Sequence, residues 1–167
     1  MVFAASGPRS DEATAGAAKL VRSPAKANLT IRAFRDGFFP YNGAAIKEIF
    51  EEIAEEFSPD IVFTHFRDDR HQDHRVISDL TWNTFRDHLI LEYEIPKYDG
   101  DFSSPNVYVS LSEEQCRNKI DVIVGTFLTQ KSKPWFTEDT FWSLLRLRGV
   151  ECASRFAEGF YCRKMMW

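Results

Sequence analysis

The chain has few cysteines and no long apolar run. Its three cysteines, Cys116, Cys152 and Cys162, are scattered over 167 residues and form no Cys-x-x-Cys pair. This argues against a disulfide framework or a cysteine-based zinc site and favours a reducing compartment. No apolar run approaches the roughly 20 residues that span a bilayer, and the first residues lack the charged and apolar regions of a signal peptide. We therefore expect a cytoplasmic protein with no membrane span.

The chain also lacks an excess of positive charge. It has 21 Lys and Arg against 25 Asp and Glu, a formal net charge of −4, which argues against nonspecific nucleic-acid binding. The absence of a glycine-rich phosphate loop disfavours a phosphoester hydrolase. The remaining composition, 44% hydrophobic, is that of an ordinary globular protein, and the length suits a single domain over residues 1–167.

Short apolar segments alternate with amphipathic ones along the chain. This alternation predicts an α/β fold, Rossmann-like, with a mostly parallel sheet and helices on both faces. Only about three good parallel strands can be counted, which is few for a sheet of the usual five to six strands. We expect strands at 1–5, 28–34, 61–63, 91–95 and 157–163, of which 61–63 is expected to be fully buried. We expect a helix that begins near residues 11–12 and further helices at 44–57, 75–88, 113–127 and 138–148.

Three local signals predict where helices begin and end. Ser10 is expected to cap the first helix, and Ser112 with Gln115 has the pattern of a capping box. Gly149 is expected to end the helix that starts near residue 138. The inner face of the 75–88 helix is expected to consist of Val76, Leu80, Thr84 and Phe85.

Residues 64–75 form the densest group of ionisable side chains. They follow an expected strand and contain three of the four histidines, three aspartates and three arginines. In an open α/β sheet, ligands and catalytic groups gather outside the carboxyl ends of the strands. His71 and His74 are three residues apart, so their rings can converge if a helix begins there. Imidazole nitrogens suit zinc, and Asp73 can bind the metal or hold a histidine in its tautomer.

This segment does not complete a metal site on spacing alone. A catalytic zinc usually takes three protein ligands, and two histidines with neighbouring carboxylates also occur in solvated, salt-bridged loops. His65, six residues before His71, remains an open candidate. His88 is excluded if the helix is continuous, since 14 residues of helix separate it from His74 by about 21 Å.

Residues 59–65, followed by 69–75, resemble the second signature of the PIG-L/LmbE-like family of zinc-dependent N-acetylglucosamine deacetylases. That signature is His-x-Asp-His after a buried strand, here His71-Gln72-Asp73-His74. Residues 6–13 resemble the loop after the family's second strand, and residues 35–37 resemble its Asp-Gly turn. Other segments are similar to the bacterial branch that deacetylates sugars in glycan or natural-product pathways. They are residues 92–101, 135–136, 147–151 and 157–160.

The resemblance implies removal of an acetyl group from an N-acetylated amino sugar or its conjugate. It implies His74 as a Zn2+ ligand, Asp73 as a catalytic residue that orients the site, and His71 as an electrostatic partner or acid near the tetrahedral oxyanion. The positions implied to contact the substrate or to shape the rim of its site are Arg9, Asp36, Asp69 and Arg70.

The chain departs from the family in one respect. The first signature, His-Pro-Asp-Asp-Glu, is absent, and the family takes from it a histidine and an aspartate for zinc and a second aspartate as general base. We therefore expect a domain without its first strand and first metal-binding loop, weak zinc binding, and self-association as a homo-oligomer through an exposed sheet edge. The alternative is an inactive carbohydrate-binding or assembly protein on the same fold. Its sugar contacts would come from Trp135, Phe136, Phe141 and Trp142.

Overall fold

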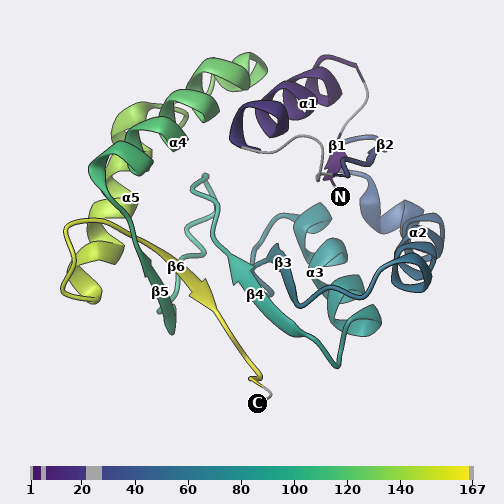
Figure 1. Ribbon diagram of the computed structural model, residues 1–167. Helices are drawn as coiled ribbons and strands as arrows, with labels where there is room; N and C mark the ends of the chain where they lie inside the picture. Colours follow the sequence, from purple (N-terminus) through teal and green to yellow (C-terminus); the bar gives the residue numbers. More distant parts are fainter. Residues whose placement is uncertain (1, 5–6, 22–27, 166–167) are drawn as a thin grey trace. The chain divides into compact units, whose positions relative to one another are not determined.

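The computed structural model describes residues 2–4, 7–21 and 28–165 (Figure 1). The chain divides into two compact units, each built from two stretches of sequence. The first unit comprises Met1–Asp36 and Ser110–Glu158, and the second comprises Gly37–Val109 and Gly159–Trp167. The expectation of a single domain over residues 1–167 remains a prediction. Met1, Ala5 and Ser6, which belong to the expected first strand and the 6–13 segment, lie outside the described residues.

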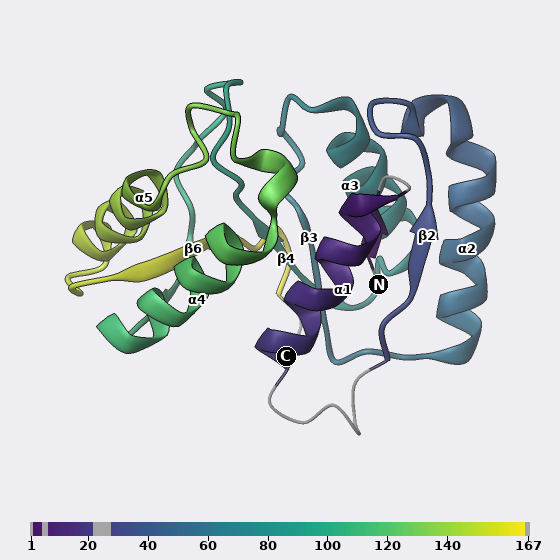
Figure 2. The same cartoon turned by 90° about the horizontal axis from the view of Figure 1, so that it is seen from above.

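The first unit is mainly helical. Its helix α4 packs against α1 on one side and α5 on the other, as two perpendicular views show (Figures 1 and 2). The strands β1 and β2 pair in parallel as a two-stranded sheet. The elements are β1 (Val2–Ala4), α1 (Pro8–Leu20), β2 (Ile31–Ala33), α4 (Glu113–Thr126), the 3-10 turn η3 (Leu128–Gln130) and α5 (Glu138–Glu151).

The second unit carries most of a four-stranded sheet in the order β3-β4-β6-β5. Strands β3 and β4 are parallel, and β4 and β6 are antiparallel. Helix α3 connects β3 to β4 and lies between β3 and α2 (Figure 1). The elements are the 3-10 turn η2 (Phe39–Asn42), α2 (Gly43–Glu56), β3 (Ile61–His65), α3 (Gln72–Thr84), β4 (Leu89–Tyr93), β5 (Val107–Ser110) and β6 (Ala157–Tyr161).

The sheet confirms the α/β class and corrects two details. It is mixed rather than mostly parallel, because β6 returns antiparallel to β4, and β5, a strand that the sequence did not predict, pairs with β6. The prediction of a fully buried β3 was wrong, since the side chains of Ile61 and Phe63 are 45% and 56% exposed. They alternate with Thr64, whose buried hydroxyl lies 2.9 Å from that of Thr81 on α3. Only the face of β3 toward α3 is therefore covered.

The aromatic residues offered as sugar contacts belong to a core. Phe136 and Phe141 are buried in the first unit with Cys116, Ile120, Leu145 and Phe156, and Trp135 and Trp142 pack against this cluster. Burial in the interior makes these rings contributors to stability, about 1.5–3 kcal/mol for each large apolar side chain that leaves water. They do not form an exposed stacking surface.

Helix boundaries show which local signals were correct. The capping box is confirmed: the Ser112 hydroxyl accepts from the Gln115 amide at 3.1 Å, and the Gln115 side chain accepts from the Ser112 amide at 2.8 Å. The expected Ser10 cap was wrong, because α1 already begins at Pro8, and proline suits a first turn whose N–H has no partner.

Gly149 does not end its helix. Helix α5 continues to Glu151, and a Cβ at Gly149 would lie 2.7 Å from the carbonyl oxygen of Arg155. The chain turns back across the helix at this point, so glycine is needed for close backbone approach rather than as a stop signal.

Helix α3 buries more polar side chains than expected. It starts at Gln72, three residues before the predicted start, and its buried residues are Asp73, Ser78 and Thr81. Val76, Leu80 and Thr84, expected on the inner face, are half-buried, while Phe85 is buried as expected. No helix in the described part of the chain combines the length and apolar character needed to span a membrane.

Candidate metal centre at the end of β3

A short loop brings three candidate ligands together. Strand β3 ends at His65 and helix α3 begins at Gln72. The Asp69 amide donates to the Phe66 carbonyl at 3.1 Å, which closes a tight turn between them. As a result, ligand atoms of His65, Asp69 and His74 all lie within 4.8 Å of one another. This group is the candidate metal centre.

The histidine rings are in direct contact. The rings of His65 and His74 stack with centroids 4.0 Å apart and planes 2° from parallel. His71 adds a third ring, 4.5 Å from that of His74. The predicted convergence of His71 and His74 is therefore what the structure shows, and His65 joins them from the end of β3.

Asp69 is the anionic member of the centre. Its side chain is only 3% exposed, and its Oδ2 lies 2.8 Å from Nδ1 of His74 and 3.0 Å from Nζ of Lys97. Its Oδ1 accepts from the His71 amide at 2.8 Å. Burial opposes ionisation, but the hydrogen bond and charge of His74, with the His71 amide and Lys97, outweigh it and lower the pKa of Asp69 to about 2. Asp69 is thus ionised at neutral pH, as a ligand must be.

His65 is held as a neutral imidazole. Burial, together with the neighbouring His74, lowers its pKa well below the ordinary value. Its Nε2 lies 3.4 Å from the hydroxyl of Tyr93, and burial with the charge of Asp69 raises the pKa of that hydroxyl, so Tyr93 stays protonated. Among the described residues, nothing bonds to the buried Nδ1 of His65.

The donor chemistry fits a divalent transition metal. A buried nitrogen without a partner costs free energy, which ligation would recover. Two imidazoles and one carboxylate are a common ligand set of catalytic zinc, which keeps a further position open for water or substrate.

The site can now be compared with known proteins. A family model described as "PIG-L: GlcNAc-PI de-N-acetylase" matches residues 4–85, which include the whole β3–α3 segment. The chain belongs to the PIG-L family. A search of curated proteins gives no match.

Solved structures share the fold of this PIG-L chain. The N,N'-diacetylchitobiose deacetylase from Pyrococcus horikoshii is 20% identical with a TM-score of 0.64, over 93% of this chain and 62% of that one. The A40926 pseudoaglycone deacetylase Dbv21 is 21% identical with a TM-score of 0.66, over 93% and 69%. The 4-carboxy-2-hydroxymuconate hydratase GalB from Pseudomonas putida is 14% identical with a TM-score of 0.66, over 96% and 72%.

Two facts limit what these neighbours mean for the PIG-L chain. It spans less than two thirds of the chitobiose deacetylase, and identities this low establish a common fold rather than a common reaction. The hydratase among them illustrates that one fold carries more than one chemistry. The function has to be argued from the site.

Asp73 of the signature faces away from solvent and binds backbone. Its carboxylate accepts from the Gly37 amide at 2.6 Å and from the Phe39 amide at 3.1 Å. It therefore joins the first turn of α3 to the turn before η2. The catalytic role that the family resemblance implies for Asp73 remains a prediction.

We expect Asp73→Asn to destabilise the protein by about 1–3 kcal/mol, because an amide has one acceptor oxygen and leaves a buried N–H without a partner. Urea unfolding measures this. Asp79→Asn, on the exposed side of the same helix, is the matched control and should change little. A normal midpoint for Asp73→Asn, with turnover lost, would instead support the catalytic role.

The predicted substrate-binding residues have different surroundings. Arg9 and Asp36 pair with each other at 2.8 Å in the first unit, where both are exposed. Arg70 is exposed, and its amide donates to Asp101 at 2.8 Å. Asp69 lies inside the metal centre rather than on a rim. Substrate contact by Arg9, Asp36, Asp69 and Arg70 remains a prediction.

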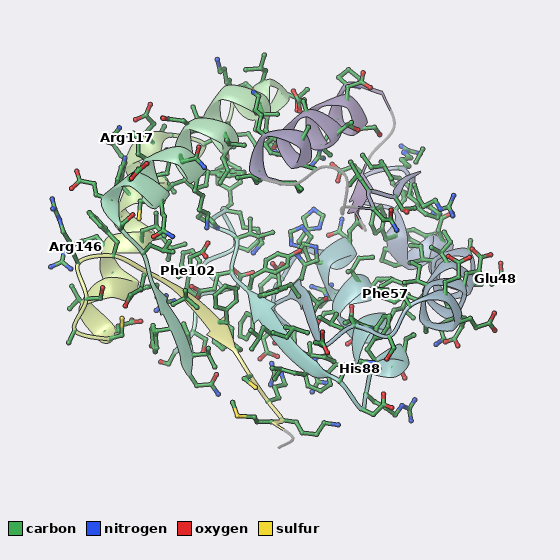
Figure 3. All side chains as sticks on the ribbon, viewed as in Figure 1. Glu48, Phe57, His88, Phe102, Arg117 and Arg146 are labelled. Carbon is green, nitrogen blue, oxygen red and sulfur yellow. The ribbon has the colours of Figure 1, made fainter. Side chains whose placement is uncertain are left out.

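Residues near the centre that sequence reasoning missed come from β4 and the loop after it. Tyr93 pairs in register with His65, and Lys97 and Asp101 follow four and eight residues later. Only the parallel pairing of β3 with β4, which no local pattern reveals, could have placed them here. His88 is excluded as expected: it lies past the far end of α3 (Figure 3), bonded to Asp87 at 3.0 Å.

Proposed function

We propose that this PIG-L chain is a metal-dependent hydrolase that removes the acetyl group from an N-acetylated amino sugar or its conjugate. The observation that carries the proposal is the cluster of His65, Asp69 and His74, with their ligand atoms within 4.8 Å at the carboxyl end of β3. The family match and the deacetylases among the structural neighbours support the reaction class.

His65, Asp69 and His74 would hold the metal, and zinc suits their donor atoms. The chemistry that such an ion supplies is Lewis-acid polarisation of a water molecule and of the amide carbonyl. Because Asp69 is ionised, its Oδ2 can only accept, so Nδ1 of His74 carries a proton. In the neutral ring, the form that binds metal, the lone pair of His74 then lies on Nε2. Asp69 fixes this tautomer, as carboxylates do for metal-binding histidines.

His71 supplies a proton donor beside the metal centre. Its Nδ1 accepts from the Asp73 amide at 3.3 Å, so in the neutral ring the proton lies on Nε2. A donor next to the His74 ring is placed to stabilise the oxyanion that develops when an amide carbonyl is attacked. Asp73 acts on this donor through its backbone N–H.

A second candidate, a carbohydrate-binding protein without turnover, is favoured by one observation. The sequence lacks the His-Pro-Asp-Asp-Glu signature that carries the general base in related proteins. The two candidates differ in whether acetate is released.

Metal removal and return tests the hydrolase. After treatment with a chelator, we expect acetate release from N-acetylglucosamine and N,N'-diacetylchitobiose to fall at least about tenfold and to recover with one equivalent of Zn2+, because a metal ion contributes several kcal/mol to the transition state. Acetate is measured by a coupled assay, with His88→Ala as a control that should behave like the unmodified protein. Saturable sugar binding without acetate, at full zinc occupancy, would favour the binding protein.

A further inference from the structure

Lys97 is a buried cation beside the metal centre. Its side chain is 9% exposed, and its Nζ lies 3.0 Å from Oδ2 of Asp69 and 2.5 Å from Oδ2 of Asp101. Asp101 is also buried, at 7% exposure, and its Oδ2 accepts from the Arg70 amide at 2.8 Å. One ammonium group therefore bridges two carboxylates, of which one belongs to the candidate ligand set.

The oxygen that Lys97 contacts is the one that faces His74. Oδ2 of Asp69 lies within hydrogen-bond distance of both Nδ1 of His74 and Nζ of Lys97. A divalent cation among His65, Asp69 and His74 would stand close to this ammonium, and charge repulsion is weakly screened at buried positions. The ammonium of Lys97 and a metal ion would therefore repel each other across the carboxylate of Asp69.

Lys97 has a second anion that can keep it paired. Asp101 is four residues further along the same loop and is held in place by the Arg70 amide. The ammonium can move away from Asp69 and remain compensated by Asp101, which avoids the large cost of an unpaired buried charge.

We propose that Lys97 is an internal cation that competes with the metal for Asp69, and that Asp101 retains Lys97 when the metal is bound. Lys97 is then a positioning residue that sets metal affinity, and neither Lys97 nor Asp101 is a ligand. The inference rests on the metal centre of the proposed function.

Zinc dissociation constants, measured by competition with a chromogenic chelator, test the inference. Lys97→Gln should bind Zn2+ at least about tenfold more tightly than the unmodified chain, since a charge of like sign is removed. Lys97→Arg keeps the charge and should stay near the original value. Arg75→Gln removes an exposed cation from helix α3 and controls for net charge.

Replacing Asp101, the second carboxylate that contacts Lys97, is expected to change zinc affinity in the opposite direction. Asp101→Asn keeps an acceptor for the Arg70 amide but leaves Lys97 paired with Asp69 alone, so Zn2+ should bind several-fold more weakly. Asp68→Asn, which removes an exposed anion from the loop between β3 and α3, is the matched control. In the Lys97→Gln background the effect of Asp101→Asn should shrink, because the coupling acts through Lys97. Asp101→Asn and its control Asp68→Asn also test the inference if Lys97→Gln does not fold.

Two results that would contradict the inference can be told apart. If the unmodified protein binds Zn2+ and Lys97→Gln binds it equally or more weakly, Lys97 only supports the structure and the inference is overturned. If Zn2+ binds to none of the proteins, including Lys97→Gln, the metal centre of the proposed function is overturned as well.

Discussion

Replacing His74 with alanine is expected to lower zinc affinity by more than about a hundredfold and to remove acetate release with it. Loss of a residue that only orients a ligand typically costs 10–100-fold, and His74 is proposed as a ligand itself. It also holds the centre together, because its ring stacks on His65 and its Nδ1 bonds to Asp69. Zinc per chain, measured by elemental analysis after dialysis, gives the first readout.

The control for His74→Ala is His88→Ala, which removes an imidazole bonded to Asp87 beyond the far end of α3. It should leave both zinc content and acetate release unchanged. Near-stoichiometric zinc in His74→Ala would contradict the ligand set and show that other residues hold the metal. Loss of zinc with a normal unfolding midpoint would show that the effect is local to the site.

Arg163→Met is expected to destabilise the fold by about 1–3 kcal/mol, because it removes the partly exposed cation that is paired with the buried carboxylate of Glu92. The Glu92 side chain on β4 is 0% exposed, and its Oε1 lies 2.7 Å from Nε of Arg163. The Trp82 indole and the Arg67 amide also donate to this carboxylate, at 2.7 and 2.9 Å. Without Arg163, these neutral donors would be left to compensate a buried negative charge. Urea unfolding gives the free energy.

An exposed ion pair provides the comparison for Arg163. Arg155 and Glu113 lie 2.9 Å apart with both side chains in solvent, and Arg155→Met should cost less than about 1 kcal/mol. Equal losses for the two methionine variants would contradict the account of Glu92. The double variant Glu92→Gln with Arg163→Met should recover part of the loss, since it removes the uncompensated charge.

Local sequence signals predicted individual helices and strands, whereas pairing between distant segments decided how the strands are arranged and exposed. The amphipathic pattern of α2 and the Ser112 capping box were sufficient because both depend on residues within one or two turns. The apolar run at residues 61–63 predicted strand β3 but not how much of it is exposed. A short apolar run occurs both in strands that are covered on one face and in strands that are covered on both faces. Strand β5 contains strand-forming Val107, Tyr108 and Val109 but is only four residues long, and its place in the sheet comes from pairing with β6.

The same distinction between local signals and tertiary pairing applies to the candidate metal centre. Spacing alone joined His71 to His74, because both lie at the start of one helix. His65 stayed an open candidate, since its position depends on where β3 ends and how the loop turns. Lys97 and Asp101 belong to the 92–101 segment that resembles the family, but nothing local placed them beside Asp69, because they reach it only through the pairing of β3 with β4 and the course of the following loop. The residue types in segment 64–75 predicted metal chemistry, whereas the fold determined which residues lie together at the candidate metal centre.

The position of β6 has a consequence for synthesis on the ribosome. Strand β4 is complete at Tyr93, but its antiparallel neighbour begins only at Ala157. While the intervening residues are made, one row of β4 backbone groups has no strand to bond to, and such a row is a template for wrong pairing with other chains. Contacts between segments so distant in sequence also form slowly. A growing chain of this protein is therefore expected to need chaperones until β6 is available.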